Sequence, residues 1–399
     1  MTGRIIRAEL VRGPGGPLAL VVLAATAGVL LVNPDWAGNW NGLAMGVRES
    51  LLLSCPLVAM AGTWAAGRQR RRQTADLLAT APRPRWQPFA ASWLALTAGA
   101  SLGLLGGWLT GGALVLPIAT YAGIGWIWTL LVCAPALGAS AAFGMAVGHF
   151  ASWRLMAPIT GIAAGLAMLW SQSMASGGFK WLAPVPGKSF LGDVGYAAST
   201  NALHTAWFSG LALTFLAVAS LRRRILALVP AALAVAAATS LMALPVHWTT
   251  EAVAEEKVCV TNGATVCGPR HQEHLYPELA GLARPMLDKI RGVPGSPTQI
   301  TYGGAEGTTL HEPTPTGALA DPADERRALA QWLASDNYRC PGRPFSEGSA
   351  AAARWLLEGI PGTEGLIASV PVRDRDWVVR YYAALETCDA AAMHELVGE

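Results

Sequence analysis

Few residues in this sequence have the type and spacing that chemistry requires. The segment His271–His274 reads His-Gln-Glu-His, which suggests a zinc site with Glu273 beside the second histidine. Zinc hydrolases place two histidines at i and i+4 on a helix, whereas these two stand at i and i+3. With His311 as a further ligand, a membrane-anchored extracytoplasmic zinc hydrolase is one hypothesis. The simpler interpretation is the polar start of a surface helix.

Two other patterns are weaker. Gly187-Lys188-Ser189 lacks the earlier glycine of a phosphate-binding loop, because position 182 is Leu. Asp374 and Asp376 alternate with arginines, which is more typical of an ion-paired helix start than of a catalytic carboxylate pair. We therefore expect no catalytic residue, no metal and no cofactor in this chain.

The amino-acid composition indicates what kind of protein these candidate residues belong to. The chain has 399 residues, of which 52% are hydrophobic and 14% charged, whereas soluble proteins carry about 25% charge. This argues against a soluble enzyme and against a nucleic-acid-binding protein. Residues 1–245 hold 16 Lys and Arg against 5 Asp and Glu, and residues 246–399 hold 13 against 21. The sequence predicts a polytopic membrane half followed by an acidic domain.

The membrane half, 15–245, is predicted to be α-helical with about seven spans. A hydrocarbon core about 30 Å thick needs roughly 17–25 apolar helical residues. The stretches that meet this length are 15–33, 50–67, 88–112, 120–148, 155–172, 203–221 and 225–245. His149, near a span end, is the one clear ionisable candidate within them. Because ion-coupled transport usually needs charges at membrane depth, their scarcity favours an external motor.

Basic residues set the predicted orientation. Thirteen arginines fall on one side when seven spans are threaded in order: Arg4, Arg7, Arg12, Arg68, Arg70, Arg71, Arg72, Arg83, Arg85, Arg154, Arg222, Arg223 and Arg224. The positive-inside rule makes that side cytoplasmic. The N-terminus is then cytoplasmic, and the odd span count places residues 246–399 outside the plasma membrane. A count wrong by one would reverse that placement.

The six cysteines are divided between the two halves. Cys55 and Cys133 lie in spans and are expected to be buried apolar residues. Cys259, Cys267, Cys340 and Cys388 lie in the 246–399 domain, where an oxidising compartment would allow disulfides. Three connectivities are possible, and we favour Cys259–Cys267 as a local loop with Cys340–Cys388 as a longer staple. A zinc site is the less favoured alternative, because no C-x-x-C pair occurs.

The 246–399 domain is long enough to bury a core of its own. Helical patterns occur at 273–291, 322–335, 347–359 and 374–388, and a strand is expected at 298–302. We predict a mainly α or α+β domain. Core packing is the expected role of Trp377, Tyr381 and Tyr382.

The loop between the second and third spans has the most specific pattern. After a basic cluster, residues 74–86 read Thr-Ala-Asp-Leu-Leu-Ala-Thr-Ala-Pro-Arg-Pro-Arg-Trp. This order resembles the cytoplasmic coupling helix of permease subunits of ABC-2 type ABC transporters, with Asp76 where glutamate is usual. The tail, with a histidine just after Cys267 and the ending 377–388, looks like the tails of actinobacterial permease-like proteins. The coupling-helix resemblance covers about 68–86. It implies ATPase-coupling roles for Thr74, Asp76, Leu77, Leu78, Ala79, Thr80, Pro82 and Arg85.

That resemblance also implies partners. The ATPase would be a separate subunit that holds ATP and Mg, and a second permease would complete a homodimer or a heterodimer within the lipid membrane. The amphipathic segment at 1–14, with Ile6 and Leu10 at i and i+4, is similar to the family's elbow helix. The family core has six spans, so the seventh span and the tail at 246–399 are departures. A third hypothesis is a membrane sensor or assembly factor whose tail binds a partner.

Overall fold

The chain folds as two compact units. The computed structural model describes residues 13–71, 86–151, 153–173, 178–187, 194–221, 223–303, 313–335, 340, 347–363, 367 and 373–398. Unit 1 comprises Met1–Pro117 and Ala122–Glu251, and unit 2 comprises Ile118–Tyr121 and Ala252–Glu399. The chain therefore passes between the units three times, because a short piece of the loop before residue 122 belongs to unit 2.

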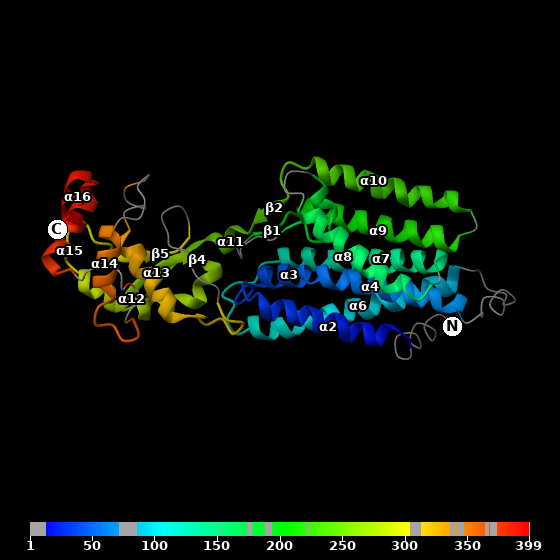
Figure 1. Ribbon diagram of the computed structural model, residues 1–399, viewed down its shortest axis with the longest axis horizontal. Helices are drawn as coiled ribbons and strands as arrows, with labels where there is room; N and C mark the ends of the chain where they lie inside the picture. The colour runs from blue at the N-terminus through cyan, green and yellow to red at the C-terminus, as the bar shows by residue number, and fades with distance from the viewer. Residues whose placement is uncertain are drawn as a thin grey trace. The chain divides into compact units, whose positions relative to one another are not determined.

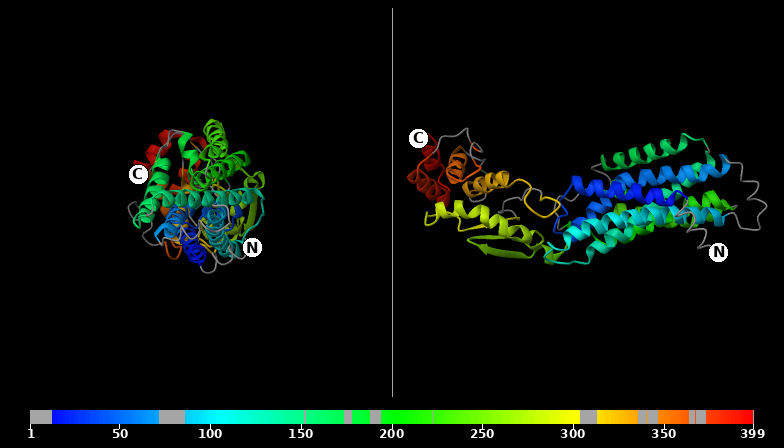
Figure 2. Two further views of the ribbon diagram at one scale, coloured as in Figure 1. Left: turned by 90° about the vertical axis from the view of Figure 1, so that its right-hand side faces the viewer. Right: turned by 90° about the horizontal axis from the view of Figure 1, so that it is seen from below.

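Unit 1 is a helical bundle whose long helices run side by side (Figures 1 and 2). Its helices are α2 (Gly15–Val32), α3 (Trp40–Glu49), α4 (Leu51–Arg71), α6 (Trp86–Val115), α7 (Gly125–Phe150), α8 (Met156–Ser173), α9 (Ala198–Ser220) and α10 (Leu228–Ala243). Two short 3-10 helices, η1 (Gly178–Leu182) and η2 (Arg224–Ala227), and an antiparallel pair of strands, β1 (Val194–Tyr196) and β2 (Trp248–Thr250), complete the described part.

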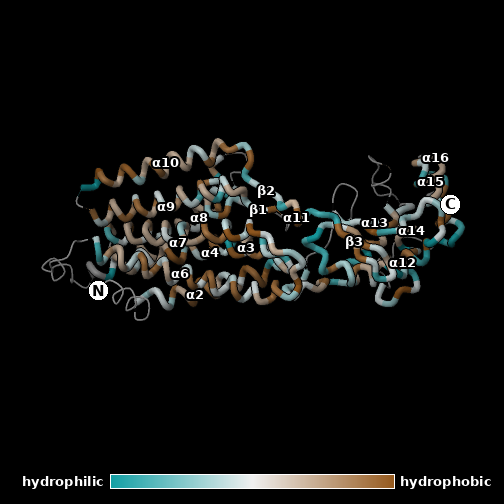
Figure 3. The backbone as a smooth tube through the Cα atoms, turned by 180° about the vertical axis from the view of Figure 1, so that it is seen from behind, coloured by the Kyte–Doolittle hydropathy of each residue, from teal (hydrophilic) through white to brown (hydrophobic). Residues whose placement is uncertain are grey.

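Within the described residues, six helices are long and apolar enough to cross a membrane: α2, α4, α6, α7, α9 and the helix formed by η2 with α10, Arg224–Ala243. Their apolar colouring is visible in Figure 3. This agrees with a multi-pass α-helical membrane protein. The expected span at 155–172 is not among the six. It forms the 18-residue helix α8, but its last turn, Ser171-Gln172-Ser173, is polar and lowers its mean hydropathy.

Helix α8 nevertheless runs along the bundle. Gly161 lies against Met60, and Gly165 lies against Pro56, so α8 is antiparallel to α4. Gly178, just after α8, packs on Met242 near the end of α10. Helix α8 therefore carries the chain from one end of the bundle to the other, although its composition is less apolar than that of the other six.

Glycines allow the closest helix pairs in unit 1. A Cβ placed on Gly103 of α6 would lie 2.2 Å from the carbonyl oxygen of Ala19 on α2. A Cβ on Gly144 of α7 would lie 2.0 Å from the carbonyl oxygen of Ala59 on α4. Backbones that approach this closely exclude every side chain but hydrogen, which is how membrane helices commonly associate.

The N-terminus of α7 has a carboxylate cap from a distant part of the chain. Glu251, the last residue of unit 1, accepts a hydrogen bond at 2.9 Å from the backbone N–H of Gly125. A Cβ on Gly123 would lie 1.7 Å from that carboxylate, so a larger residue there would force the Glu251 side chain to move. A negative charge at a helix N-terminus is favourable because it meets unpaired N–H groups and the positive end of the helix dipole.

Unit 2 contains a three-stranded sheet in the order β3-β4-β5, formed by Lys257–Asn262, Ala264–Pro269 and Gln299–Thr301. Strands β3 and β4 are an antiparallel hairpin, and β4 pairs with β5 in parallel. The turn is Asn262-Gly263, where Gly263 adopts a φ of +80° that favours glycine. The hairpin was absent from the sequence prediction, although Asn-Gly between alternating Val, Cys and Thr is its usual signal.

Helices form the rest of unit 2 and, together with this sheet, enclose its core. They are α11 (Ala252–Glu255), η3 (Arg270–Leu275), α12 (Tyr276–Ile290), α13 (Pro322–Ala334), α14 (Glu347–Leu357), α15 (Arg375–Thr387) and α16 (Ala390–Gly398). The four predicted helical stretches correspond to η3 with α12, and to α13, α14 and α15. Trp377, Tyr381 and Tyr382 are buried in the core as expected, and the rings of Trp377 and Tyr381 stack.

Candidate functional site

The predicted coupling residues, from Thr74 to Arg85, lie outside the described residues, as does most of the elbow segment 1–14. The structure does describe the two helices that residues 72–85 join. Phe89, near the start of α6, contacts His149 at the end of α7. Gly148 of α7 packs on Thr63, toward the end of α4. The segment 72–85 therefore connects two helices whose joined ends lie at the same end of the bundle.

Basic residues gather at that end, which we call the arginine end. Arg154, Arg223 and Arg224 are exposed there, and the Arg224 guanidinium lies 5.3 Å from the centre of the Phe150 ring. The acidic residues of unit 1 that the structure describes are Asp35, Glu49 and Glu251, and all three lie in segments at the opposite end. The charge asymmetry expected from the sequence is therefore present within the bundle.

The opposite end holds a buried arginine that is absent from the residues singled out in the sequence. Arg48 of α3 is 1% exposed. Its Nε donates to the carbonyl oxygen of Pro184 at 2.7 Å, and one terminal nitrogen donates to Asn201 Oδ1 at 2.8 Å. The other terminal nitrogen lies 3.0 Å from Nδ1 of His204. The guanidinium also stacks over the Tyr196 ring at 4.0 Å.

These contacts make Arg48 the centre of a cluster of neutral hydrogen-bond partners. His204 Nε2 lies 2.7 Å from the carbonyl oxygen of Trp181, so hydrogen bonds link both ring nitrogens to neighbours. Because Arg48 donates at the Nδ1 side, His204 accepts there and donates from Nε2 as a neutral imidazole. The described partners of Arg48 are carbonyl, amide, imidazole and phenol groups. Desolvation of a charge is therefore offset by hydrogen bonds and a ring face rather than by a carboxylate.

The cluster joins four parts of unit 1. Arg48 comes from α3, His204 and Asn201 from α9, and Tyr196 from β1, while Pro184 follows η1. An aromatic layer lies next to it, because the Trp181 ring stacks on His247 at 3.6 Å and Tyr196 stacks on Trp248 at 4.5 Å. This arrangement fixes the short helix α3 to the start of α9.

His204 corrects one expectation. The sequence analysis named His149 as the one clear ionisable residue in the spans, but His204 lies fully buried in α9, inside the expected span 203–221. Asn201 and His204 stand at i and i+3, which puts both on one face of the helix. That pair of polar residues at the start of an apolar stretch was the available signal.

The cysteines of unit 2 form the two favoured pairs. Cys259 and Cys267 face each other across the β3–β4 hairpin, with Cα atoms 4.0 Å apart. Cys340 bonds to Cys388, which ends α15 in the left-handed conformation. Cys55 and Cys133 are free and buried, as expected. The first disulfide closes a hairpin, and the second joins segments that are 48 residues apart.

The histidine pair of unit 2 lies in η3 rather than on a long helix. His271 is buried with its Nδ1 3.2 Å from the carbonyl oxygen of Ala254. Neither ring nitrogen of His274 has a hydrogen-bond partner in the part of the chain that the structure describes. Burial, together with the nearby His271, lowers the pKa of His274 to about 4. His311 lies outside the described residues, and the described ones contain no group of three or more potential metal ligands.

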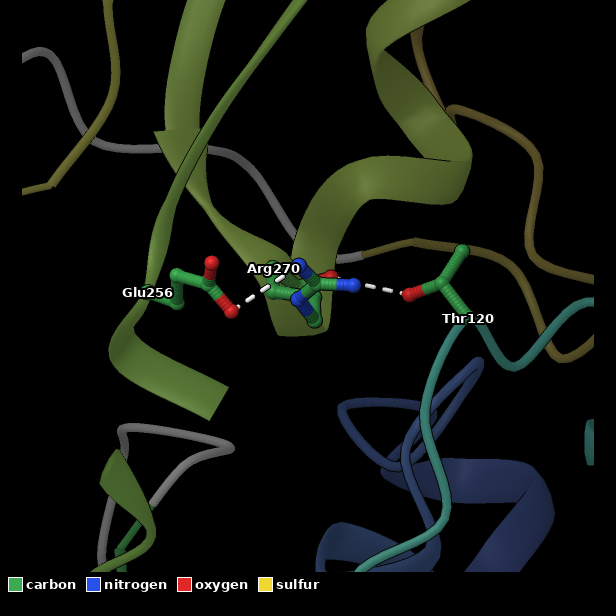
Figure 4. A network of polar contacts seen from close by, with 3 residues as sticks. All are labelled: Thr120, Glu256 and Arg270. Atoms are coloured by element: carbon green, nitrogen blue, oxygen red, sulfur yellow. Dashed lines mark hydrogen bonds and ion pairs between the residues drawn. The ribbon is translucent and has the colours of Figure 1, made fainter. Parts of the chain in front are cut away.

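Thr120, from the segment Ile118–Tyr121, is held within unit 2. Its hydroxyl donates to the carbonyl oxygen of Arg270 at 2.9 Å. The Arg270 guanidinium in turn pairs with Glu256 at 2.9 Å (Figure 4). Gly317 adopts a φ of +75° that favours glycine, and a Cβ there would lie 2.5 Å from the end of the Ile118 side chain. Asp374 caps α15 by accepting from the backbone N–H of Trp377 at 2.8 Å, which gives it a structural role.

Comparisons with known proteins give this chain no relative: no protein-family model, no curated protein and no solved structure matches it. What the sites described above can do is therefore inferred from their geometry alone.

Proposed function

We propose that this chain is the transmembrane permease subunit of an ATP-driven ABC-2 type exporter. The observation that carries the proposal is the position of the segment 72–85. It joins α4 to α6 at the arginine end, where the sequence between Thr74 and Arg85 resembles a coupling helix. The multi-pass helical bundle supports the same function.

In this function the chain has no chemistry of its own. ATP and Mg²⁺ bind to a separate ATPase subunit, and that subunit presses on the coupling segment, about 68–86. Because the segment continues directly into α4 and α6, a push would tilt these two helices first. Nucleotide then biases the bundle between two states, as any ligand does that binds one state better. A second permease, as a homodimer or heterodimer, completes the transporter.

The same proposal assigns the orientation in the plasma membrane. The arginine end would be cytoplasmic by the positive-inside rule. Unit 2 would then be extracytoplasmic, because α8 carries the chain across and β2 follows α10 at the opposite end. Two disulfides in unit 2 support this side, since structural disulfides persist in oxidising compartments.

The first test is co-purification with the ATPase. Leu77→Glu combined with Leu78→Glu should abolish recovery of an ATPase subunit with this chain, because an apolar docking face would carry two charges. The matched control is Arg154→Glu, since Arg154 is exposed at the same end but lies outside both the coupling segment and the candidate membrane spans. Equal recovery of an ATPase with both variants, or recovery of none with the unaltered chain, would refute the proposal.

The orientation is tested separately by cysteine labelling in intact cells. A cysteine replacing exposed Glu358 in unit 2 should react with an impermeant maleimide from outside. A cysteine replacing Arg223 should react only after lysis. The reverse pattern would contradict the assigned orientation. It would leave the result of the co-purification test unaffected.

A further inference from the structure

A groove opens on unit 2 where α12, α13 and the loop that follows α14 meet, and we call it the α12 groove. Its volume is about 290 Å³, close to the lower end of the range of roughly 300–1,000 Å³ that is common for small-ligand sites. Its lining comes from α12 (Gly281, Leu282 and Pro285), from α13 (Arg326) and from the loop (Gly359, Ile360 and Pro361). None of these lining residues is acidic, and Arg326 is the one that is charged.

The loop that forms one wall of the α12 groove is held by hydrogen bonds. The Thr363 hydroxyl donates to the carbonyl oxygen of Ile360 at 2.7 Å. Lys289 of α12 donates to the carbonyl oxygen of Trp355 at 2.8 Å and to that of Glu358. The wall therefore keeps its shape without a ligand, and little conformational freedom has to be lost when one binds.

Gly281 and Pro285 leave a backbone acceptor available in the groove. They stand at i and i+4 of α12, and both residue types are unfavourable inside a helix. Because proline has no N–H, the carbonyl oxygen of Gly281 lacks the donor that an α-helix normally supplies four residues later. Glycine has no side chain, so the atoms of Gly281 that line the groove are backbone atoms. A Cβ at Gly281 would meet no atom within 4 Å, so packing does not account for this glycine.

Arg326 brings a positive charge that has no carboxylate partner among the described residues. One of its terminal nitrogens donates to the carbonyl oxygen of Pro361 at 3.1 Å. A guanidinium carries five N–H donors, so others remain for a ligand. The neighbouring Arg327 differs, because it pairs with Asp324 at 3.0 Å. Arg326 is also partly buried, and a guanidinium in such a position binds a carboxylate through two parallel hydrogen bonds.

These groups together define the chemistry of a ligand. The Arg326 guanidinium calls for an anionic group, and the Gly281 carbonyl oxygen calls for an N–H donor. The side chains of Leu282, Pro285 and Ile360 call for an apolar portion. The carboxyl-terminal end of a peptide has all three, namely a carboxylate, amide N–H groups and a side chain. A fatty acid or an inorganic phosphate has no N–H to donate.

We propose that the α12 groove binds the carboxyl-terminal end of a short peptide with an apolar last residue. Arg326 holds the terminal carboxylate, the Gly281 carbonyl oxygen accepts a peptide N–H, and the last side chain lies against Leu282 and Ile360. The proposal does not depend on the ATPase-coupled function, because every residue of the groove belongs to unit 2.

The test is isothermal titration calorimetry on the purified full chain in detergent. The probes are acetyl-alanyl-leucine and acetyl-alanyl-phenylalanine, each as the free acid and as the carboxamide. At least one free acid should bind saturably and about tenfold more tightly than its carboxamide, because only the acid forms a charge-assisted pair with Arg326. No saturable binding of either acid up to about 10 mM, or equal affinity for acid and carboxamide, would overturn the proposal.

Octanoate separates a peptide from a fatty acid. It has a carboxylate and an apolar chain but no N–H, so it should bind about tenfold more weakly than the peptide acid. Equal or tighter binding of octanoate would overturn the assignment of a peptide.

Variants locate the binding in the groove. Gly281→Leu should abolish binding of the peptide acid, because the new side chain would occupy the groove. The melting temperature should not fall, since the Cβ has room and leucine favours a helix. Arg326→Gln should weaken binding of the acid about tenfold and remove its advantage over the carboxamide. Arg327→Gln is the matched control and should bind like the unaltered chain. Unchanged binding in Gly281→Leu, or equal losses in the two arginine variants, would overturn the proposal.

Discussion

The two units of this protein are held together by opposite means. Unit 1 brings backbones together through glycine, so that Gly103 and Gly144 touch carbonyl oxygens, while its large apolar side chains, such as Leu20 and Leu233, point outward. Unit 2 encloses large side chains, such as Tyr276 and Tyr382, and adds two disulfides. This is the difference expected when close backbone packing holds helices in an apolar medium and side-chain burial holds a domain in water.

The largest expected effect tests the glycine contacts of unit 1. Gly103→Leu should prevent α2 and α6 from packing and cost about 3 kcal/mol or more, because the side chain would occupy the position of the Ala19 carbonyl. Gly28→Leu is the control, since a Cβ there would meet no atom within 4 Å. Thermal unfolding in detergent measures both. Similar losses in the two variants would break the comparison.

The disulfides of unit 2 should come next. Cys340→Ser with Cys388→Ser should cost about 4 kcal/mol, and Cys259→Ser with Cys267→Ser only about 2.5 kcal/mol, because the longer loop gains more freedom in the unfolded chain. Denaturant unfolding of the full chain, followed by a unit 2 probe, gives the two values. A larger loss from the hairpin pair would mean that the stabilisation does not come from loop closure.

Arg48 tests whether unit 1 also relies on a buried polar centre. Arg48→Met should cost about 3 kcal/mol, because it leaves Asn201 and His204 without their charged partner. Arg223→Met, at an exposed arginine, should change the melting temperature little. A mild effect at Arg48, equal to that at Arg223, would show that glycine packing alone holds α3 in place.

The smallest expected effect is a pH dependence of the stability of unit 2, which arises from His274. The pKa of His274 is lowered in the folded state to about 4, so the neutral form is favoured there. The stability that the neutral form contributes is complete above the unfolded pKa of about 6.5 and falls by about 3 kcal/mol as the pH drops to 4.

His274→Leu should remove most of that pH dependence from the unfolding of unit 2, while His394→Leu, at an exposed site, should keep it. Unfolding free energies at pH 7 and pH 4.5 provide the measurement. An unchanged dependence in His274→Leu would assign the acid sensitivity to another group.

Much of the fold could be predicted from the sequence because the patterns were long and apolar. Six of the seven expected spans have the length and hydropathy to cross a membrane, and the favoured cysteine pairs formed. The β3–β4 hairpin was missed because its signal is short, and Asn262-Gly263 was not read as a turn. Local patterns of this kind are specific only when the flanking alternation is counted with them.

The site was less predictable. Arg48 is a loop residue by hydropathy, and its burial depends on Asn201 and His204, which lie more than 150 residues away. No local sequence pattern predicts a contact between residues so far apart in the sequence. The coupling segment from Thr74 to Arg85 rests on sequence resemblance alone, because it lies outside the described residues.

The membership of Ile118–Tyr121 in unit 2 bears on how the protein is made. This short segment leaves the ribosome long before its partner, since Thr120 and Arg270 are separated by 150 residues. Unit 2 therefore cannot be finished by its own stretch of chain in the order of synthesis. The segment stays without its partner until Arg270 has been synthesised, and a fragment that begins at residue 252 would lack the segment.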